Sequence, residues 1–295
     1  MHIVRGVFSG IFAFVLVCVL VILGIVVTVD ATILNPEFLI SEFDRLDIYS
    51  IVVDQAKSQL VEAEPHMAQI ADESLAEVEP WLREQAASAV YSGCAYLKGE
   101  KELDIVISLE QPRAILKENL AQTIHESPPP ELERASQAQI EAFIAQACAE
   151  IDSQVPEQVE INELSVGPEA AAHLREARQI VGYIELGRKA LIGLAVVLIL
   201  VIALIQWWYA RAIARYVGIA FAVAGGIGIA GSILARSLIP GLIQLEVPPA
   251  IEAKLPQLVG DSSGPLQIYG IAFLVVGIVL IVLSIKLKSR SAENW

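Results

Sequence analysis

Two cysteines in the polar middle of the chain are the first candidates for chemistry. Cys94 and Cys148 lie 54 residues apart, whereas Cys18 lies in an apolar run. In an oxidising compartment a disulfide between them would stabilise the folded chain by about 3–4 kcal/mol on the chain-entropy model. Two unpaired thiols are the alternative, because the sequence does not give the distance between their Cα atoms. We therefore treat Cys94 and Cys148 as a candidate disulfide.

The best local cluster of metal-ligating residue types is formed by Glu169, His173 and Glu176. Their spacing of four and three residues places them on one face of a helix, where they could hold a divalent cation. A solvated polar face is the commoner reason for such a row, and the histidines match no zinc-binding spacing. We predict no metal and no cofactor, with this cluster as a weak candidate and nonspecific calcium association left open.

Motifs for covalent or nucleotide chemistry are not recognisable. The sequence contains no GxSxG nucleophile elbow and no P-loop. A glycine-rich run from Ala224 to Gly231 superficially resembles a nucleotide loop, but it lies in an apolar segment with no strand before it. The sequence therefore predicts a protein that is not an enzyme.

Charge divides the chain into two parts. Residues 30–188 hold 30 acidic and 11 basic residues, whereas the remaining 136 residues hold four acidic and nine basic ones. The whole chain is 55% hydrophobic with a mean hydropathy of +0.58, which is typical of an integral membrane protein. Nucleic-acid binding is disfavoured because the sequence offers no basic patch.

Four apolar segments are long enough to cross a bilayer. The first has an apolar run too long for a secretory signal peptide, so we predict an uncleaved signal anchor, with cleavage after Ala31 as the alternative. The second ends in an aromatic belt of the kind found at membrane interfaces, formed by Trp207, Trp208 and Tyr209. The four predicted segments are residues 1–30, 189–209, 216–239 and 265–287.

Basic residues on the flanks of these segments predict their orientation. With the N-terminus inside, the cytoplasmic flanks carry six Lys and Arg residues and the external flanks carry four. We expect a multi-pass protein of the cytoplasmic membrane with both termini in the cytoplasm. Residues 31–188 and the loop of residues 240–264 would lie outside, and residues 288–295 would form a cytoplasmic tail.

The extracytoplasmic segment is predicted to be a helical module. Apolar positions from Leu39 to Leu60 recur at steps of three and four, which predicts one helix, and a second helix is predicted to break near Pro80. Alternation in residues 103–109 and 158–164 predicts two strands that pair as a small ribbon. A helix, a strand and a helix follow one another around each cysteine, which suggests a repeat, and residues 168–208 predict one unbroken helix into the membrane. The predicted fold is thus a mainly α-helical membrane protein.

The third apolar segment carries rows of small residues. Close backbone approach is how membrane helices gain packing contacts, so we expect these residues to pack against the other segments of the chain, with a homo-oligomer contact as the alternative. The candidate packing residues of this segment are Gly218, Ala222, Gly226, Gly228 and Gly231.

A sizeable acidic domain and apolar segments without reactive groups suggest a binding function. We expect a non-enzymatic envelope protein whose domain binds a partner protein or ligand, as a scaffold or sensor. The bilayer is the second expected partner. The alternative is an oligomeric channel or transporter accessory subunit, packed through the small residues of the third segment.

Overall fold

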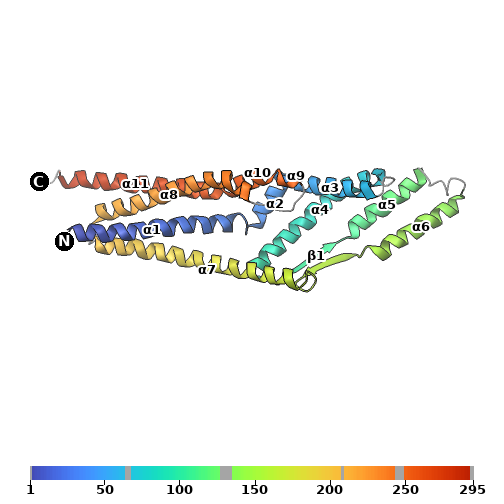
Figure 1. Ribbon diagram of the computed structural model, residues 1–295, viewed down its shortest axis with the longest axis horizontal. Helices are drawn as coiled ribbons and strands as arrows, with labels where there is room; N and C mark the ends of the chain where they lie inside the picture. The colour runs from blue at the N-terminus through green and yellow to red at the C-terminus, as the bar shows by residue number, and fades with distance from the viewer. Residues whose placement is uncertain (1, 64–67, 127–134, 207–208, 243–248, 293–295) are drawn as a thin grey trace. The chain divides into compact units, whose positions relative to one another are not determined.

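Helices account for most of the chain in the computed structural model, which describes residues 2–63, 68–126, 135–206, 209–242 and 249–292 (Figure 1). The helices are α1 (His2–Ala31), α2 (Pro36–Arg45), α3 (Ile48–Ala63), α4 (Ala68–Leu97), α5 (Glu110–Glu126), α6 (Gln137–Gln154), α7 (Pro168–Ile205), α8 (Ala210–Leu242), α9 (Pro249–Glu252), α10 (Leu255–Ser262) and α11 (Gly264–Ala292). The strands are β1 (Asp104–Ser108) and β2 (Gln158–Asn162).

Internal contacts divide the chain into two compact units. We call the first the apolar bundle; it comprises Met1–Phe38, Gln179–Val247 and Glu252–Trp295. We call the second the acidic domain; it comprises Leu39–Arg178 and Pro248–Ile251.

Four helical stretches of the described chain are long and apolar enough to cross a membrane, which indicates a multi-pass membrane protein. They correspond to the four segments expected from the sequence, and α7 confirms the predicted long helix as far as Ile205. Residues 243–248 of the expected external loop lie outside the described residues, and the rest of that loop contains α9 and α10. The four stretches are Gly6–Ala31, Pro168–Ile205, Ala210–Ile239 and Pro249–Lys286.

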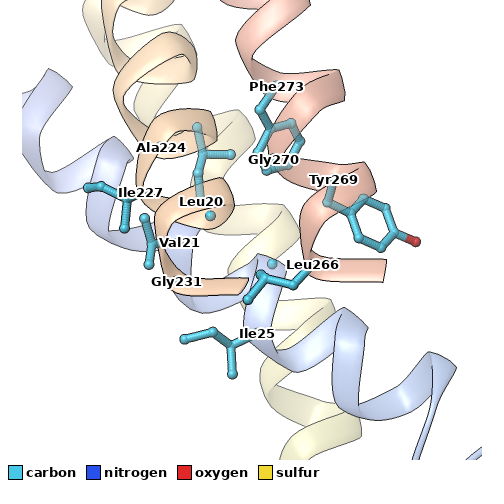
Figure 2. A pocket seen from close by; sticks show the side chains of 12 residues that line it. Leu20, Val21, Ile25, Ala224, Ile227, Gly231, Leu266, Tyr269, Gly270 and Phe273 are labelled. Carbon is cyan, nitrogen blue, oxygen red and sulfur yellow. The ribbon is translucent and has the colours of Figure 1, made fainter. Parts of the chain in front are cut away.

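The core of the apolar bundle joins α1, α7 and α8. Leu16 of α1 and Ile202 of α7 are fully buried, and Ala220 of α8 packs in the same cluster. An apolar cavity of about 100 Å³ lies between α1, α8 and α11. Figure 2 shows the Tyr269 hydroxyl pointing away from the other labelled side chains, so the cavity wall is apolar.

Glycines bring α8 and α11 into backbone contact. A Cβ atom added to Gly277 would lie 2.4 Å from the Ala222 nitrogen, and one added to Gly225 would lie 2.5 Å from the Gly270 carbonyl oxygen. Gly218 meets the Gly277 carbonyl oxygen at 3.0 Å in the same way. Glycines seven residues apart on each helix therefore face one another across an antiparallel pair, and the two backbones pack closely.

The small residues predicted to pack separate into two groups. Gly218, Ala222 and Gly228 lie against α11, which agrees with packing within the chain. An added Cβ at Gly226 meets nothing within 4 Å, and at Gly231 it reaches only a side-chain atom of Leu266, at 3.9 Å. These two glycines are not needed for close approach to another described helix.

Two helix boundaries in the acidic domain differ from the sequence prediction. The helix expected from Leu39 to Leu60 is interrupted at Asp47, which adopts a left-handed conformation with φ of 55° between α2 and α3. Asp tolerates this conformation better than most residues. Conversely, α4 continues through Pro80, where a break was expected. Packing against α3, α5 and β1 holds this helix, despite the hydrogen bond that proline removes.

The predicted ribbon is confirmed. β1 and β2 pair in antiparallel register, with Ile105 opposite Ile161 and Val106 opposite Glu160. The half-buried side chains Ile105, Ile107 and Ile161 share one face, and polar side chains dominate the other. The expected alternation of strand residues therefore holds in both strands.

The backbone contact between α8 and α11 gives a testable prediction. Gly277→Ala should lower the stability of the purified full-length chain by about 1–3 kcal/mol, the usual cost of overpacking. Its methyl group would meet the Ala222 nitrogen at 2.4 Å. Thermal unfolding in detergent, followed by circular dichroism, measures the change. The matched control is Gly226→Ala, which adds the same methyl group with no neighbour within 4 Å. Equal melting temperatures for the two variants would contradict the packing described here.

Candidate partner-binding arm

One continuous excursion of the chain forms the most distinctive part of the acidic domain. The order β1, α5, α6, β2 means that α5 leaves the ribbon and α6 returns to it. The two helices pack against each other, as Figure 1 also shows. We call residues 104–162 the arm: the antiparallel ribbon is its stem, and α5 and α6 form its outer part.

The stem is joined to α4 by hydrogen bonds at the end of the free edge of β1. The backbone N–H of Leu109 donates to the Glu157 carbonyl at 2.8 Å, which extends the ribbon by one pair. Ser108 lies one residue earlier, so its backbone groups point to the opposite edge. There Trp81 Nε1 donates to the Ser108 carbonyl at 2.8 Å, and the Ser108 N–H donates to Gln85 Oε1 at 3.3 Å. Side chains of α4 thus satisfy the backbone groups of Ser108 at the end of this edge.

Ion pairs hold α5 and α6 together next to the stem. Asp152 of α6 pairs with both Arg113 and Lys117 of α5, and Arg113 also lies 3.7 Å from the Glu157 carboxylate. Hydrogen bonds from Lys117 and Arg113 lower the pKa of Asp152. These charges line an open hollow together with Glu110. Because they are paired, their simplest role is to fix the angle at which the two helices leave the ribbon.

A second group of polar contacts fixes the end of β2 to α4 and α7. The hydroxyl of Tyr96, a side chain only 1% exposed, donates to Glu163 Oε1 at 2.9 Å. Arg175 Nε donates to the other carboxylate oxygen at 2.8 Å, and Arg178 lies 4.9 Å from the centre of the Tyr96 ring. We call these four residues the tyrosine node.

Ionisation of the node favours the folded state at neutral pH. Hydrogen bonds from Arg175 and Tyr96 lower the pKa of Glu163, while burial is the main cause that raises the pKa of Tyr96. A carboxyl group with a lowered pKa contributes stability above its unfolded pKa and loses it as the pH falls through the folded value. The node is therefore intact at neutral pH and weakens in acid.

The solvent-exposed side of α6 carries one large apolar side chain and several alanines among polar residues. No described residue of α6 is fully buried, and α5 is the only element of the described chain with which α6 packs extensively. Phe143 is 42% exposed, and the exposed side chains of Gln139, Gln146 and Glu150 lie on the same side of the helix. Four exposed alanines form a separate stripe along the helix, namely Ala138, Ala142, Ala145 and Ala149.

The candidate disulfide is not formed in the structure. Cys94 and Cys148 are both free thiols, the first buried on α4 and the second half-buried on α6. The physical reason is the path of the arm, because α5 packs against both α4 and α6. Burial raises the pKa of the Cys94 thiol and so reduces its reactivity.

The other residues singled out from the sequence do not converge on a site. Glu169, His173 and Glu176 are all exposed on α7, and the described residues contain no group of three or more His, Cys, Asp or Glu arranged to hold a metal. Tyr209, which immediately precedes α8, is 72% exposed. Trp207 and Trp208, the other members of the predicted aromatic belt, lie outside the described residues.

Sequence reasoning found the strands but missed the arm. The recurring order of helix, strand and helix suggested a repeat. In the structure the two strands pair antiparallel, and α5 and α6 lie between them in the chain as one continuous segment. The available signal was the run of three prolines at residues 128–130, midway between two strands expected to pair.

Comparisons with known proteins give no match: no family model, no curated protein and no solved structure is similar to this chain. The geometry of the arm is therefore the basis for a functional proposal.

The tyrosine node gives a testable prediction. Tyr96→Phe keeps the ring beside Arg178 but removes the hydroxyl that donates to Glu163. We expect amide hydrogen exchange in residues 96–100 and 158–163 of the full-length chain to accelerate about fivefold, the effect of losing one typical hydrogen bond. Tyr91→Phe is the matched control, because the Tyr91 ring is exposed on the same helix. Unchanged exchange in Tyr96→Phe would show that the node does not hold the stem.

Proposed function

We propose that the chain is a non-enzymatic membrane protein of the cell envelope that binds a partner protein through the outer face of α6. The apolar bundle anchors the chain, and the arm presents the binding face. The proposal rests on the exposure of Phe143 and of a stripe of four alanines on a helix that, among the described residues, packs extensively with α5 alone. Removing these apolar side chains from water would favour binding, and the small alanines would allow a partner to approach the helix closely.

The chemistry of the arm suggests the character of the partner. Residues 110–154 contain eight acidic and three basic residues, so the surroundings of the α6 face are negatively charged. A partner with an apolar groove or helix and a basic rim would complement it, because opposite charge speeds association while apolar contact at the centre supplies affinity.

The hydrogen bonds and ion pairs at the base of the arm support a role in binding, because a segment that only spaces two parts of a chain would not need a fixed orientation. Trp81 and Gln85 secure the stem, and Arg113 and Lys117 join α5 to α6 through Asp152. A helix held at fixed orientation loses less conformational freedom on binding than a flexible segment. The α6 face is thus preorganised within the acidic domain.

The orientation that we propose places both termini in the cytoplasm and the acidic domain outside, with α1 as a signal anchor. The distribution of basic residues on the helix flanks supports it. A channel formed by several copies has less support, because Gly218, Gly225 and Gly228 of α8 are occupied by contacts with α11 of the same chain.

A site-specific photocrosslinking experiment tests the proposed binding face. A photoreactive amino acid replaces Gln146, an exposed residue of α6, in full-length protein expressed in its native membrane. We expect one discrete protein adduct, reduced at least tenfold by Phe143→Glu because the charge would be buried against an apolar partner surface.

Val52→Glu is the matched control, because Val52 is 41% exposed on α3 and lies outside the arm. It should leave the adduct unchanged. The proposal fails if no adduct forms at Gln146, or if both glutamate variants reduce the adduct equally.

A further inference from the structure

A polar hollow lies at the end of the apolar bundle where α7 gives way to α8. It has a volume of about 470 Å³ and combines walls from α1, the end of α7 and the first two turns of α8. Two arginines, two tyrosines and a glutamine provide its polar groups. We call it the arginine hollow; its lining is Gly6, Gln206, Tyr209, Arg211, Ala212, Arg215 and Tyr216.

The two arginines of the hollow carry uncompensated charge. Arg211 and Arg215 are exposed, and neither forms an ion pair with an acidic side chain in the described part of the chain. They lie one helical turn apart on the same face, so their charges repel each other. By contrast, Arg188 of the same bundle is paired with Asp30. A bound anion between Arg211 and Arg215 would relieve this repulsion.

Neighbouring contacts give the hollow a defined wall. Gln206 Nε2 donates to the fully buried hydroxyl of Ser9 at 2.7 Å, which ties the end of α7 to α1. The Tyr216 hydroxyl packs against Gly6, 3.6 Å from where a Cβ atom would lie. The hollow is therefore built by contacts between helices, and the arginines project from a fixed framework.

The level of the hollow along the helices identifies the class of anion. Residues 190–205 of α7 and residues 217–235 of α8 contain no charged side chain, and the arginine hollow begins where both apolar runs stop. Phosphate groups of lipids lie at this boundary, and Tyr is favoured there because its ring is apolar and its hydroxyl is polar. A lipid phosphate would reach the hollow without leaving the bilayer.

We propose that the arginine hollow binds the phosphate-bearing headgroup of an anionic phospholipid. Arg211 and Arg215 donate to the phosphate oxygens, for which the planar guanidinium fork is well suited. Tyr209 and Tyr216 offer hydroxyl groups to the headgroup, and the acyl chains remain in the surrounding bilayer. Basic pockets between membrane helices are a known mode of anionic lipid recognition. The site is independent of the arm and of its proposed partner.

Lipid retention by the purified full-length chain tests this inference. The protein is exchanged from detergent into mixed micelles containing phosphatidylglycerol or phosphatidylcholine, and bound lipid is counted by native mass spectrometry. We expect the parent chain to retain phosphatidylglycerol in preference to phosphatidylcholine, and R211Q/R215Q to lose this retention at least tenfold. The double variant K101Q/K189Q is the matched control, because it removes two exposed charges elsewhere and should retain phosphatidylglycerol like the parent.

Further variants separate binding from folding and from nonspecific charge. If R211Q/R215Q does not fold, the single variants R211Q and R215Q should each reduce phosphatidylglycerol retention at least threefold at an unchanged melting temperature. Equal retention of the two lipids by the parent would overturn the proposal, as would an equal loss in K101Q/K189Q. Displacement of phosphatidylglycerol by millimolar inorganic phosphate alone would assign the hollow to a soluble anion and so overturn the lipid assignment.

Discussion

The antiparallel pairing of β1 with β2 is the constraint on which the acidic domain depends. It brings residues 104–108 beside residues 158–162 and so converts the 49 intervening residues into one excursion. A lone two-stranded ribbon is marginal in water. Here Trp81 and Gln85 of α4 bond the backbone of Ser108 at one edge, and the tyrosine node secures the end of β2. The surface offered by α6 is a consequence of this fastening.

Each of the two units is held together by a different kind of contact. In the apolar bundle, α8 and α11 approach until Gly225 and Gly277 leave no room for a Cβ atom, since lipid provides no hydrophobic drive between helices. In the acidic domain, contacts between elements often run through polar side chains such as Tyr96 and Asp152. Salt and acid should therefore affect the acidic domain more than the apolar bundle.

The sequence predicted elements with strong periodic patterns and missed features that depend on long-range contacts. The apolar segments, α7 and both strands follow from hydrophobic length and alternation, which are local properties. The break at Asp47 and the continuity of α4 through Pro80 could not be predicted, because tertiary packing decides them. The free thiols of Cys94 and Cys148 follow from the path of the arm, which depends on the antiparallel direction of pairing.

In the candidate site, too, local patterns were predictable and long-range contacts were not. Small residues on α8 were recognised, but their true partners, Gly270 and Gly277, lie on another helix, and a single helix pattern does not identify a partner. The arm could not be predicted for a related reason: the sequence shows α5 and α6 as two separate helices, and only the register of the ribbon makes them one structure. The polar ties of Tyr96 connect residues 67 positions apart.

Disulfide trapping of the ribbon tests the account most directly. Val106 and Glu160 lie opposite each other, on a face exposed to solvent, whereas Val159 points to the other face. In a full-length chain with Cys18, Cys94 and Cys148 replaced by alanine, V106C/E160C should form an intramolecular disulfide on mild oxidation. V106C/V159C, the pair expected for a strand slipped by one residue, should remain reduced. Preferential oxidation of V106C/V159C, or no difference between the pairs, would contradict the register and with it the arm.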